Sequence, residues 1–374
     1  MATTDFGSLT AAQKEHWAVK VFVDGRDESF WMSSGLVGRN TEDHNRPVHR
    51  ITELSESVEG AGTKVTMQIV HDLVNDGVAG DQQLTGNEEA MENEAITIQV
   101  DQLRHGVKKK GRMSEQKTVV KFRSNAQGQL SFWLADTLDE LKFLTASGRA
   151  YTLNTDGSTR SQTVLSQLEF AADVAAATTN RVIHAGAATS EGTLTATDTM
   201  DWDFLVNAKA FAERKKIRPI RAGGRSYYIV VMSTEQMRDL RKDSDFKSIV
   251  QNAMGRGKSN PLFTGEDVQC EGLILYSHNK VYNTFGLTSG VDKWGSGQTV
   301  DGAQALLMGA QALGFATVTD PYWEEADKND YNNQPGIGYG QIFGLLKPQF
   351  ESPVDGTTED YGVLSLKTAA AASS

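Results

Sequence analysis

Hydrophobic and polar residues alternate with a period of two along two nearby stretches of the chain. In the first stretch, Val65, Met67 and Ile69 are separated by polar residues, and in the second Ile96 and Ile98 are spaced in the same way. This alternation predicts two strands of a long hairpin over 63–103, with one apolar face that needs a neighbouring subunit to cover it. About twenty polar residues connect the strands, whereas hairpin loops usually have roughly two to five. We therefore expect the connection to have a function of its own.

Helical spacing appears further along the chain. Leu130, Trp133, Leu134, Leu138 and Leu141 recur at intervals of three and four residues and predict a helix over 129–145. The remaining predicted elements are helices over 163–178, 203–216, 234–243 and 303–315, strands over 227–232, 273–276, 340–346 and 362–366, and polar loops over 184–199, 252–267 and 320–330. Ser233 with Gln236 three residues later predicts a capped start for the helix at 234. The mixture of elements predicts an α+β fold.

Aromatic residues mark a helix-bearing N-terminal arm over residues 8–32. Trp17, Phe30 and Trp31 are its candidate anchors. Two interpretations stay open for them. They pack on their own domain, or they hold a neighbouring subunit.

Charge is distributed in two adjoining blocks of opposite sign. The acidic block from 76 to 101 contains no Lys or Arg, and its members are Asp76, Asp81, Glu88, Glu89, Glu92, Glu94 and Asp101. The basic block that follows contains Arg104, Lys108, Lys109, Lys110, Arg112, Lys117, Lys121 and Arg123, with Glu115 as its one acid. Such a pattern is typical of surfaces that dock between copies of a chain. The alternative is two solvated faces of one molecule that screen each other.

Composition limits the class of protein. The chain has 374 residues, a net charge of -11 and a single cysteine, Cys270. The acidic balance argues against a dedicated nucleic-acid binder, and one cysteine excludes an intrachain disulfide framework. The N-terminus has no secretory pattern, and no apolar run approaches the about 18 residues that a membrane span needs.

Candidate chemistry is sparse. Gly257-Lys258-Ser259 resembles the end of a phosphate-binding loop, but Asn252 stands where the first glycine is required. His44 and His49 are separated by Pro47 and do not share a helical face, so we expect no zinc site, no other metal site and no cofactor. The acids Asp320, Glu324, Glu325, Asp327 and Asp330 leave open a metal-dependent enzyme with its site in the 320–330 loop.

Five short segments resemble a known family. They are 216–220 (KIRPI), 227–231 (YYIVV), 239–243 (DLRKD), 270–276 (CEGLILY) and 305–312 (ALLMGAQA). Together with the order of elements, they resemble the major capsid proteins of tailed phages with the Hong Kong 97-type fold, and the coliphage N4-type capsid family in particular. The resemblance covers roughly residues 5–367. It implies a non-enzymatic structural protein of the virion, made in the host cytoplasm.

The resemblance also implies a domain plan and partners. The plan is an N-terminal arm and the start of the P-domain over 1–60, the E-loop hairpin and basic return segment over 61–112, the spine helix and P-domain over 113–220, mainly the A-domain with a return to the P-domain over 221–340, and closing strands with a flexible tail over 341–374. The implied partners are copies of the chain in hexamers and pentamers, a scaffolding protein, a portal, decoration proteins and packaged double-stranded DNA, with no membrane. No Lys, Asn and Glu set matches the self-crosslinking chemistry of the type member.

These observations favour a shell subunit whose acidic hairpin tip docks on the basic residues of an adjacent copy. An encapsulin-like cargo compartment is the alternative within the same fold. The enzyme with an acidic site at 320–330 is the alternative from a different class.

Overall fold

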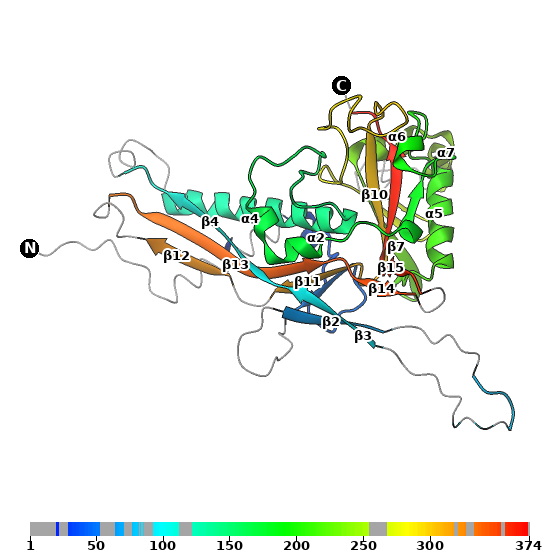
Figure 1. The fold of residues 1–374 in the computed structure, drawn as a ribbon, viewed down its shortest axis with the longest axis horizontal. Helices are drawn as coiled ribbons and strands as arrows, with labels where there is room; N and C mark the ends of the chain where they lie inside the picture. The colour runs from blue at the N-terminus through cyan, green and yellow to red at the C-terminus, as the bar shows by residue number, and fades with distance from the viewer. Residues whose placement is uncertain are drawn as a thin grey trace, which may run out of the picture.

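The chain folds as an elongated α+β subunit built around two sheets (Figure 1). The computed structural model describes residues 20–21, 29–52, 64–70, 77–81, 83, 85, 93–111, 122–253, 268–317, 321–326, 333–352 and 356–372. Its helices are α2 (Phe30–Ser33), α4 (Phe122–Ser147), α5 (Trp202–Arg214), α6 (Thr234–Lys242) and α7 (Ser244–Ala253). Its short 3₁₀ turns are η1 (Leu165–Gln167), η2 (Glu169–Asp173), η3 (Thr179–Arg181) and η4 (Glu191–Thr193).

The strands divide between two sheets and two separate hairpins. They are β1 (Val48–Ile51), β2 (Lys64–Val70), β3 (Asn93–Gln99), β4 (Asp101–Lys108), β5 (Val182–His184), β6 (Ile220–Ala222), β7 (Arg225–Met232), β8 (Val268–Cys270), β9 (Leu273–Ser277), β10 (Gly302–Met308), β11 (Leu313–Thr317), β12 (Tyr322–Ala326), β13 (Gly336–Leu346), β14 (Gln349–Glu351), β15 (Thr358–Asp360) and β16 (Val363–Ala369). The first sheet has the order β1-β11-β13-β12, and β4 pairs with the other edge of β13. The second has the order β5-β16-β10-β7-β9-β8.

The long helix α4 lies along the first sheet (Figure 1). Leu134, Leu138 and Leu141 point into a core that Phe315 and Phe343 supply from β11 and β13. The predicted helix over 129–145 is confirmed, and it begins seven residues earlier, at Phe122. It ends where Gly148 takes a φ of +65°, a conformation that glycine adopts without strain.

The second sheet packs its apolar face against α5, α6 and α7 (Figure 1). The predicted helix over 203–216 is α5, which Asp201 caps by accepting a hydrogen bond from the Phe204 amide. The predicted capping box is also present, because Ser233 and Gln236 exchange hydrogen bonds at the start of α6. None of the helices in the described ranges combines the length and hydropathy that a membrane span requires.

The predicted hairpin is confirmed as β2 and β3, with Val65 opposite Ile98 and Met67 opposite Ile96. Its apolar face is covered by the first sheet of the same chain rather than by a neighbour. A Cβ at Gly314 would lie 2.7 Å from the Ile98 side chain and 3.1 Å from the Met67 sulfur. The glycine on β11 therefore makes the space in which the base of the hairpin packs.

The predicted helix over 303–315 is wrong. This segment forms the central strand β10, a turn at Gln311 with a φ of +56°, and β11. All seven residues of β10 are buried, because β7 and β16 flank it and both faces of the sheet are covered. A strand buried on both faces has no alternation, so its run of small apolar residues resembles a buried helix.

The predicted helix over 163–178 is also wrong. The structure has the two 3₁₀ turns η1 and η2 here, with an extended residue, Leu168, between them. Leu168 and Phe170 are buried in the main core, while most of their neighbours are partly exposed. Two anchoring side chains close together in sequence hold the segment down, and a continuous helix would carry one of them away from the core.

Candidate assembly surfaces

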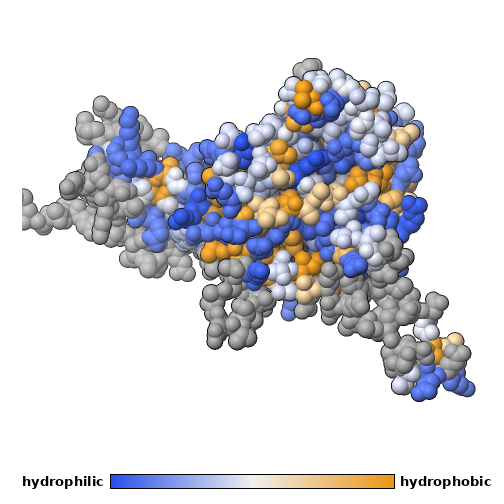
Figure 2. Space-filling model, viewed as in Figure 1, coloured by the Kyte–Doolittle hydropathy of each residue, from blue (hydrophilic) through white to orange (hydrophobic). Residues whose placement is uncertain are grey.

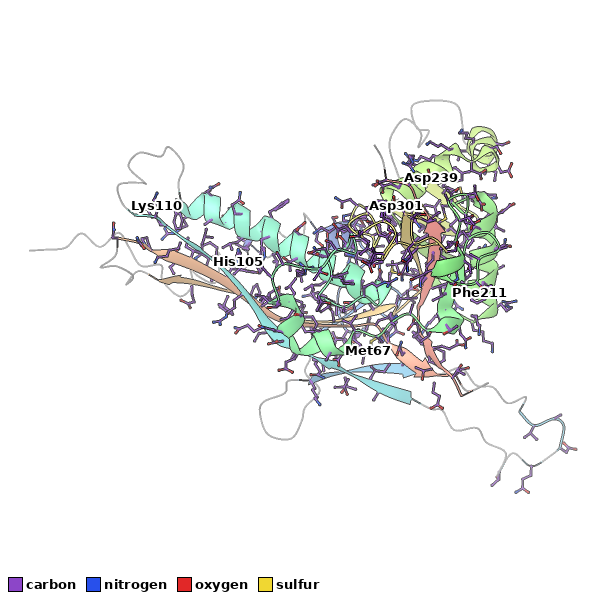
Figure 3. All side chains as sticks on the ribbon, turned by 45° about the horizontal axis from the view of Figure 1, so that its top comes forward. Met67, His105, Lys110, Phe211, Asp239 and Asp301 are labelled. Carbon is purple, nitrogen blue, oxygen red and sulfur yellow. The ribbon has the colours of Figure 1, made fainter. Side chains whose placement is uncertain are left out.

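The hairpin and the basic segment lie at opposite ends of the subunit. The described residues of the hairpin connection, 77–81, project beyond the β2–β3 end of the molecule, and Asp81 is exposed there (Figure 1). Lys110 lies at the far end of the first sheet, where β4 stops (Figure 3). The predicted residues Asp76, Glu88, Glu89, Glu92 and Arg112 lie outside the described residues. Asp81 and Lys110 therefore lie at opposite ends of the subunit, whereas Asp101 and Arg104, where the two blocks adjoin, lie close together on β4.

The basic end is fixed by β-sheet pairing. β4 pairs with β13 along its whole length, from Asp101 opposite Phe343 to Lys108 opposite Gly336. The Lys109 amide donates to the Pro335 carbonyl, and Lys108 and Lys110 are exposed. The segment therefore presents lysines from a rigid sheet edge rather than from a loop.

Phe30 and Trp31 pack within their own subunit, which is one of the two alternatives open from the sequence. Trp31 is fully buried, and its ring lies 4.9 Å from that of Phe143 on α4. The Asp139 carboxylate accepts hydrogen bonds from the Ser29 hydroxyl at 2.6 Å and from the Phe30 amide at 2.7 Å. The start of α2 is therefore clamped on α4 by a buried charge. Trp17 lies outside the described residues.

A histidine completes this clamp. The ring of His278, just after β9, lies 4.7 Å from that of Phe30 and 5.0 Å from that of Phe143. Burial lowers the pKa of His278, and the charge of Asp139 opposes that effect. His278 thus joins the second sheet to the arm and to α4 as a neutral aromatic ring.

The predicted acidic loop at 320–330 contains strand β12, so this expectation is wrong in its structure. Successive strand residues point to opposite faces, which separates Glu324 from Glu325. Arg123 binds the Glu325 carboxylate through two hydrogen bonds of 2.8 and 2.7 Å, and the Trp323 indole donates to it as well. Within the described ranges no three His, Cys, Asp or Glu side chains converge as metal ligands would. Asp320, Asp327 and Asp330 lie outside those ranges.

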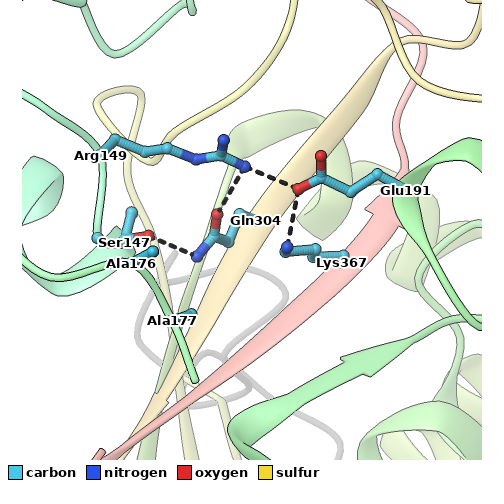
Figure 4. A pocket seen from close by; sticks show the side chains of 8 residues that line it. Ser147, Arg149, Ala176, Ala177, Glu191, Gln304 and Lys367 are labelled. Atoms are coloured by element: carbon cyan, nitrogen blue, oxygen red, sulfur yellow. Dashed lines mark hydrogen bonds and ion pairs between the residues drawn. The ribbon is translucent and has the colours of Figure 1, made fainter. Parts of the chain in front are cut away.

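A small polar pocket lies between the end of α4 and the second sheet (Figure 4). The Glu191 carboxylate forms ion pairs with Arg149 at 2.8 Å and with Lys367 at 2.7 Å. One negative charge therefore faces two positive charges and neutralises them only in part. Gln304, from the central strand β10, donates to the Ser147 carbonyl at the end of α4. These bonds connect α4 to the second sheet, and the pocket serves as a structural junction.

A second polar junction is fully buried. Lys347 and Asp360 form an ion pair of 3.0 Å with both side chains inaccessible to solvent. Beside it, Glu359 binds Arg181 at 2.9 Å and Lys215 at 3.1 Å. Burial lowers the pKa of Lys347, and the Asp360 charge opposes that effect. The cluster joins β15, which leads from the first sheet into the second, to η3 and the end of α5.

Sequence reasoning missed these junctions and one histidine pair. His44 and His49 stack with ring centroids 4.7 Å apart, although they do not share a helix. Their contact depends on the turn at Gln311, whose side-chain amide nitrogen lies 3.2 Å from the Nδ1 of His44. No spacing rule brings residues 44 and 311 together, so the sequence does not predict the contact that accompanies the histidine stack.

The surface agrees with an assembling subunit. In Figure 2, hydrophilic and hydrophobic residues are interspersed over the visible face, and several hydrophobic patches lie over the middle of the subunit. The subunit is elongated, is held together internally by buried ion pairs, and presents acidic and basic segments at its two ends. These features define a structural protein that assembles with copies of itself.

Comparison with known proteins gives the particular family. The family model for "Phage capsid protein" matches residues 5–372. The major capsid protein of Pseudomonas phage KPP25 is 40% identical over 378 residues, which cover 98% of each chain. The chain therefore belongs to the phage capsid protein family. It is a major capsid protein of the virion and not an enzyme, which decides against the metal-dependent enzyme and the cargo compartment.

Solved structures agree with this assignment. The capsid of Ralstonia phage GP4 superposes with a TM-score of 0.77 at 26% identity, covering 100% of this chain and 99% of that one. The capsid subunit of cyanophage Pam1 gives a TM-score of 0.67 at 19% identity over 99% and 100% of the two chains. Phage capsid subunits have the Hong Kong 97-like fold, so the fold prediction is confirmed.

Proposed function

We propose that copies of this chain form hexamers and pentamers that close into an icosahedral head around double-stranded DNA, as in the coliphage N4-type branch of the family. The subunit is made in the host cytoplasm. A scaffolding protein and a portal act during assembly, and decoration proteins bind the finished shell. In the Hong Kong 97 plan, the β2–β3 hairpin is the E-loop, α4 is the spine helix of the P-domain with the first sheet, and the second sheet is the core of the A-domain.

One observation carries the proposal that copies join end to end. The described part of the acidic hairpin connection and the lysines at the end of β4 lie at opposite ends of one subunit. Opposite charges at opposite ends favour a head-to-tail contact, which generates a ring when the rotation between copies closes. The acidic tip, including Asp76, Asp81, Glu88, Glu89 and Glu92, then docks on Lys108, Lys109, Lys110 or Arg112 of the next copy.

Charge reversal tests this contact. We expect Glu88→Lys, Glu89→Lys and Glu92→Lys together to prevent shell formation while the subunit stays folded. The control reverses three exposed acids outside the hairpin, Glu169, Glu213 and Asp292, and should assemble normally. Electron microscopy of the particles and the circular dichroism melting curve of the subunit are the measurements.

A second variant makes the test specific. By itself, reversal of Lys108, Lys109 and Lys110 to Glu should also prevent assembly. Combining it with the reversal of the hairpin acids should restore shells. Normal shells from the hairpin variant would refute the contact. Failure of the wild-type chain to assemble, with the head genes of its own phage present, would refute the shell function itself.

A further inference from the structure

One face of the long helix α4 is covered over half of its length and exposed over the other half. Positions 125, 128, 132, 136, 139 and 143 follow each other at intervals of three and four residues, so they share this face. Toward the end of the helix, α2 covers Asp139 and Phe143, as described above. Toward its beginning, Asn125, Gly128 and Phe132 are exposed.

Phe132 is the most exposed large hydrophobic side chain in the described part of the subunit, at 63%. Its neighbour Trp133 is partly buried against His105 of β4, with ring centroids 4.7 Å apart. The two aromatic residues therefore differ in role. Trp133 fastens the helix to its own sheet, whereas Phe132 points outward from it.

Gly128 lies one helical turn before Phe132. Glycine inside a helix is unfavourable, because its backbone loses more freedom on folding than that of any other residue. The fold of the subunit does not require a glycine at position 128, because a Cβ there would meet no atom within 4 Å. A glycine next to an exposed aromatic residue instead leaves space for a second backbone to approach the helix.

We propose that this surface, formed by Asn125, Gly128, Phe132 and Asp136, binds a second copy of the chain in the assembled shell. Phe132 is the apolar anchor, and Gly128 admits the backbone of the neighbouring copy. Asp136 and Asn125 form a polar rim, in which Asp136 is held by an ion pair with Lys280. The surface also continues the face on which α4 already binds α2.

The occupant follows from the class of protein. This inference rests on the proposed shell function, in which each subunit is surrounded by copies of itself. The described residues expose two other large hydrophobic side chains, Val164 and Val291, at 56% each, far from Phe132 in sequence. A head-to-tail contact joins two different surface patches of the same protein. The separate exposed apolar residues of this chain can supply both patches.

The Gly128→Ala substitution separates an assembly role from a folding role. Alanine should raise the Tm of the isolated subunit by roughly 1–2 °C, because it favours the helix and meets no neighbour. The same substitution should lower the yield of shells by about tenfold or more, because the added methyl group obstructs the second backbone. We expect Phe132→Ala to lower the yield as strongly with little change in Tm. Asn207→Ala, an exposed position on α5 and outside this surface, is the control and should assemble normally.

A photocrosslink identifies the occupant directly. A benzoylphenylalanine at position 132, irradiated in particles, should give a product of twice the subunit mass that contains only this chain. A crosslink within one chain, a crosslink to a protein of another mass, or no crosslink would each overturn the proposal, as would normal shells from both Gly128→Ala and Phe132→Ala. If the wild-type chain forms no particles with its own head genes, the proposed shell function fails, and this contact fails with it.

Discussion

Replacing the buried lysine Lys142 with methionine should stabilise the subunit. Lys142 belongs to α4, its side chain is fully buried, and its ammonium group lies 4.8 Å from the centre of the Phe315 ring. No described residue forms a hydrogen bond with it. The charge of Asp139 favours the ammonium form and that of Arg50 opposes it, and the Asp139 carboxylate already accepts hydrogen bonds from Ser29 and Phe30.

The pKa gives the magnitude. Burial lowers the pKa of Lys142 from 10.5 to about 8, against the attraction of Asp139. At about 1.36 kcal/mol for each pH unit, the charged form costs the folded state about 3 kcal/mol relative to the unfolded chain at pH 7. Methionine has a similar volume and no charge, and its sulfur makes favourable contacts with aromatic rings. Lys142→Met should therefore raise the free energy of unfolding by up to about 3 kcal/mol.

The pH dependence distinguishes this cause from improved packing. Between pH 8 and 10.5, Lys142 is protonated in the unfolded chain and neutral in the folded one. The unfolded state then binds more protons, so the free energy of unfolding of the wild type should rise with pH across this window. The difference between the variant and the wild type should shrink over the same window and stay constant below pH 7.

Urea denaturation of the unassembled subunit, followed by tryptophan fluorescence from pH 6.5 to 10, is the assay. Lys142→Leu serves as a second apolar variant, so that one poorly packed side chain does not decide the outcome. Destabilisation by more than about 1 kcal/mol in both variants, or a difference independent of pH, would refute the reasoning. Either result would mean that the ammonium group is stabilised by contacts stronger than its burial.

Three further predictions follow from the same contacts. Gly148→Ala should lower the free energy of unfolding by more than about 2 kcal/mol in urea denaturation, because the φ is +65° and a Cβ would lie 2.5 Å from the Ala175 carbonyl oxygen; Gly128→Ala, without strain, is its control. Asp139→Asn should cost about 2–3 kcal/mol and make the arm before α2 more sensitive to limited proteolysis, because two hydrogen bonds lose a charged acceptor; unchanged cleavage would contradict the clamp. Burial lowers the pKa of His278, so stability should fall as the pH decreases from 6.5, where the unfolded chain gains a proton first; His278→Phe should reduce this loss in acid melting curves, and an identical acid profile would contradict it.

Local patterns predicted the parts of the fold whose contacts are local. The β2–β3 hairpin follows from strict alternation, and its register pairs residues that the sequence places on one face. The capping box of Ser233 and Gln236 spans one turn, so sequence spacing is sufficient to identify it. The helix α4 follows from its leucines, although its first turns lack them and were missed.

The central strand β10 shows why other parts were not predictable. Apart from Gln304 its residues are apolar, and buried helices and doubly buried strands can have the same composition. What makes it a strand is the pair of neighbours β7 and β16, which come about 75 residues before it and about 60 after it. Propensity is a weak determinant against backbone pairing with β16 along the whole strand and with β7 over Leu306–Met308.

The candidate assembly surfaces also include a part that local sequence patterns predict and a part that depends on distant contacts. The sequence identified the acidic and basic blocks, because each is a run along the chain, but adjacency in sequence also suggested that they screen each other. The pairing of β4 with β13 carries the lysines to the far end of the sheet, and this could not be inferred from charge alone. The α4 surface was missed although Phe132 is out of phase with Leu130 and Leu134, because only the packing shows that no other part of the subunit covers its side chain.

The two junctions between the sheets limit how the subunit adapts within a shell. After its first crossing, from β4 through α4 to β5, the chain passes from one sheet to the other twice more, through the turn between β10 and β11 and through β14 and β15 into β16. At the first of these two later passages, the packed backbone leaves no space for a Cβ at Gly309, which would lie 2.3 Å from the Arg218 carbonyl oxygen. At the second, separating Lys347 from Asp360 would leave a buried charge unpaired, at a cost of about 3–5 kcal/mol. A subunit that occupies both fivefold and sixfold positions, as proposed here, should therefore keep the two sheets together and adjust at its contact surfaces instead.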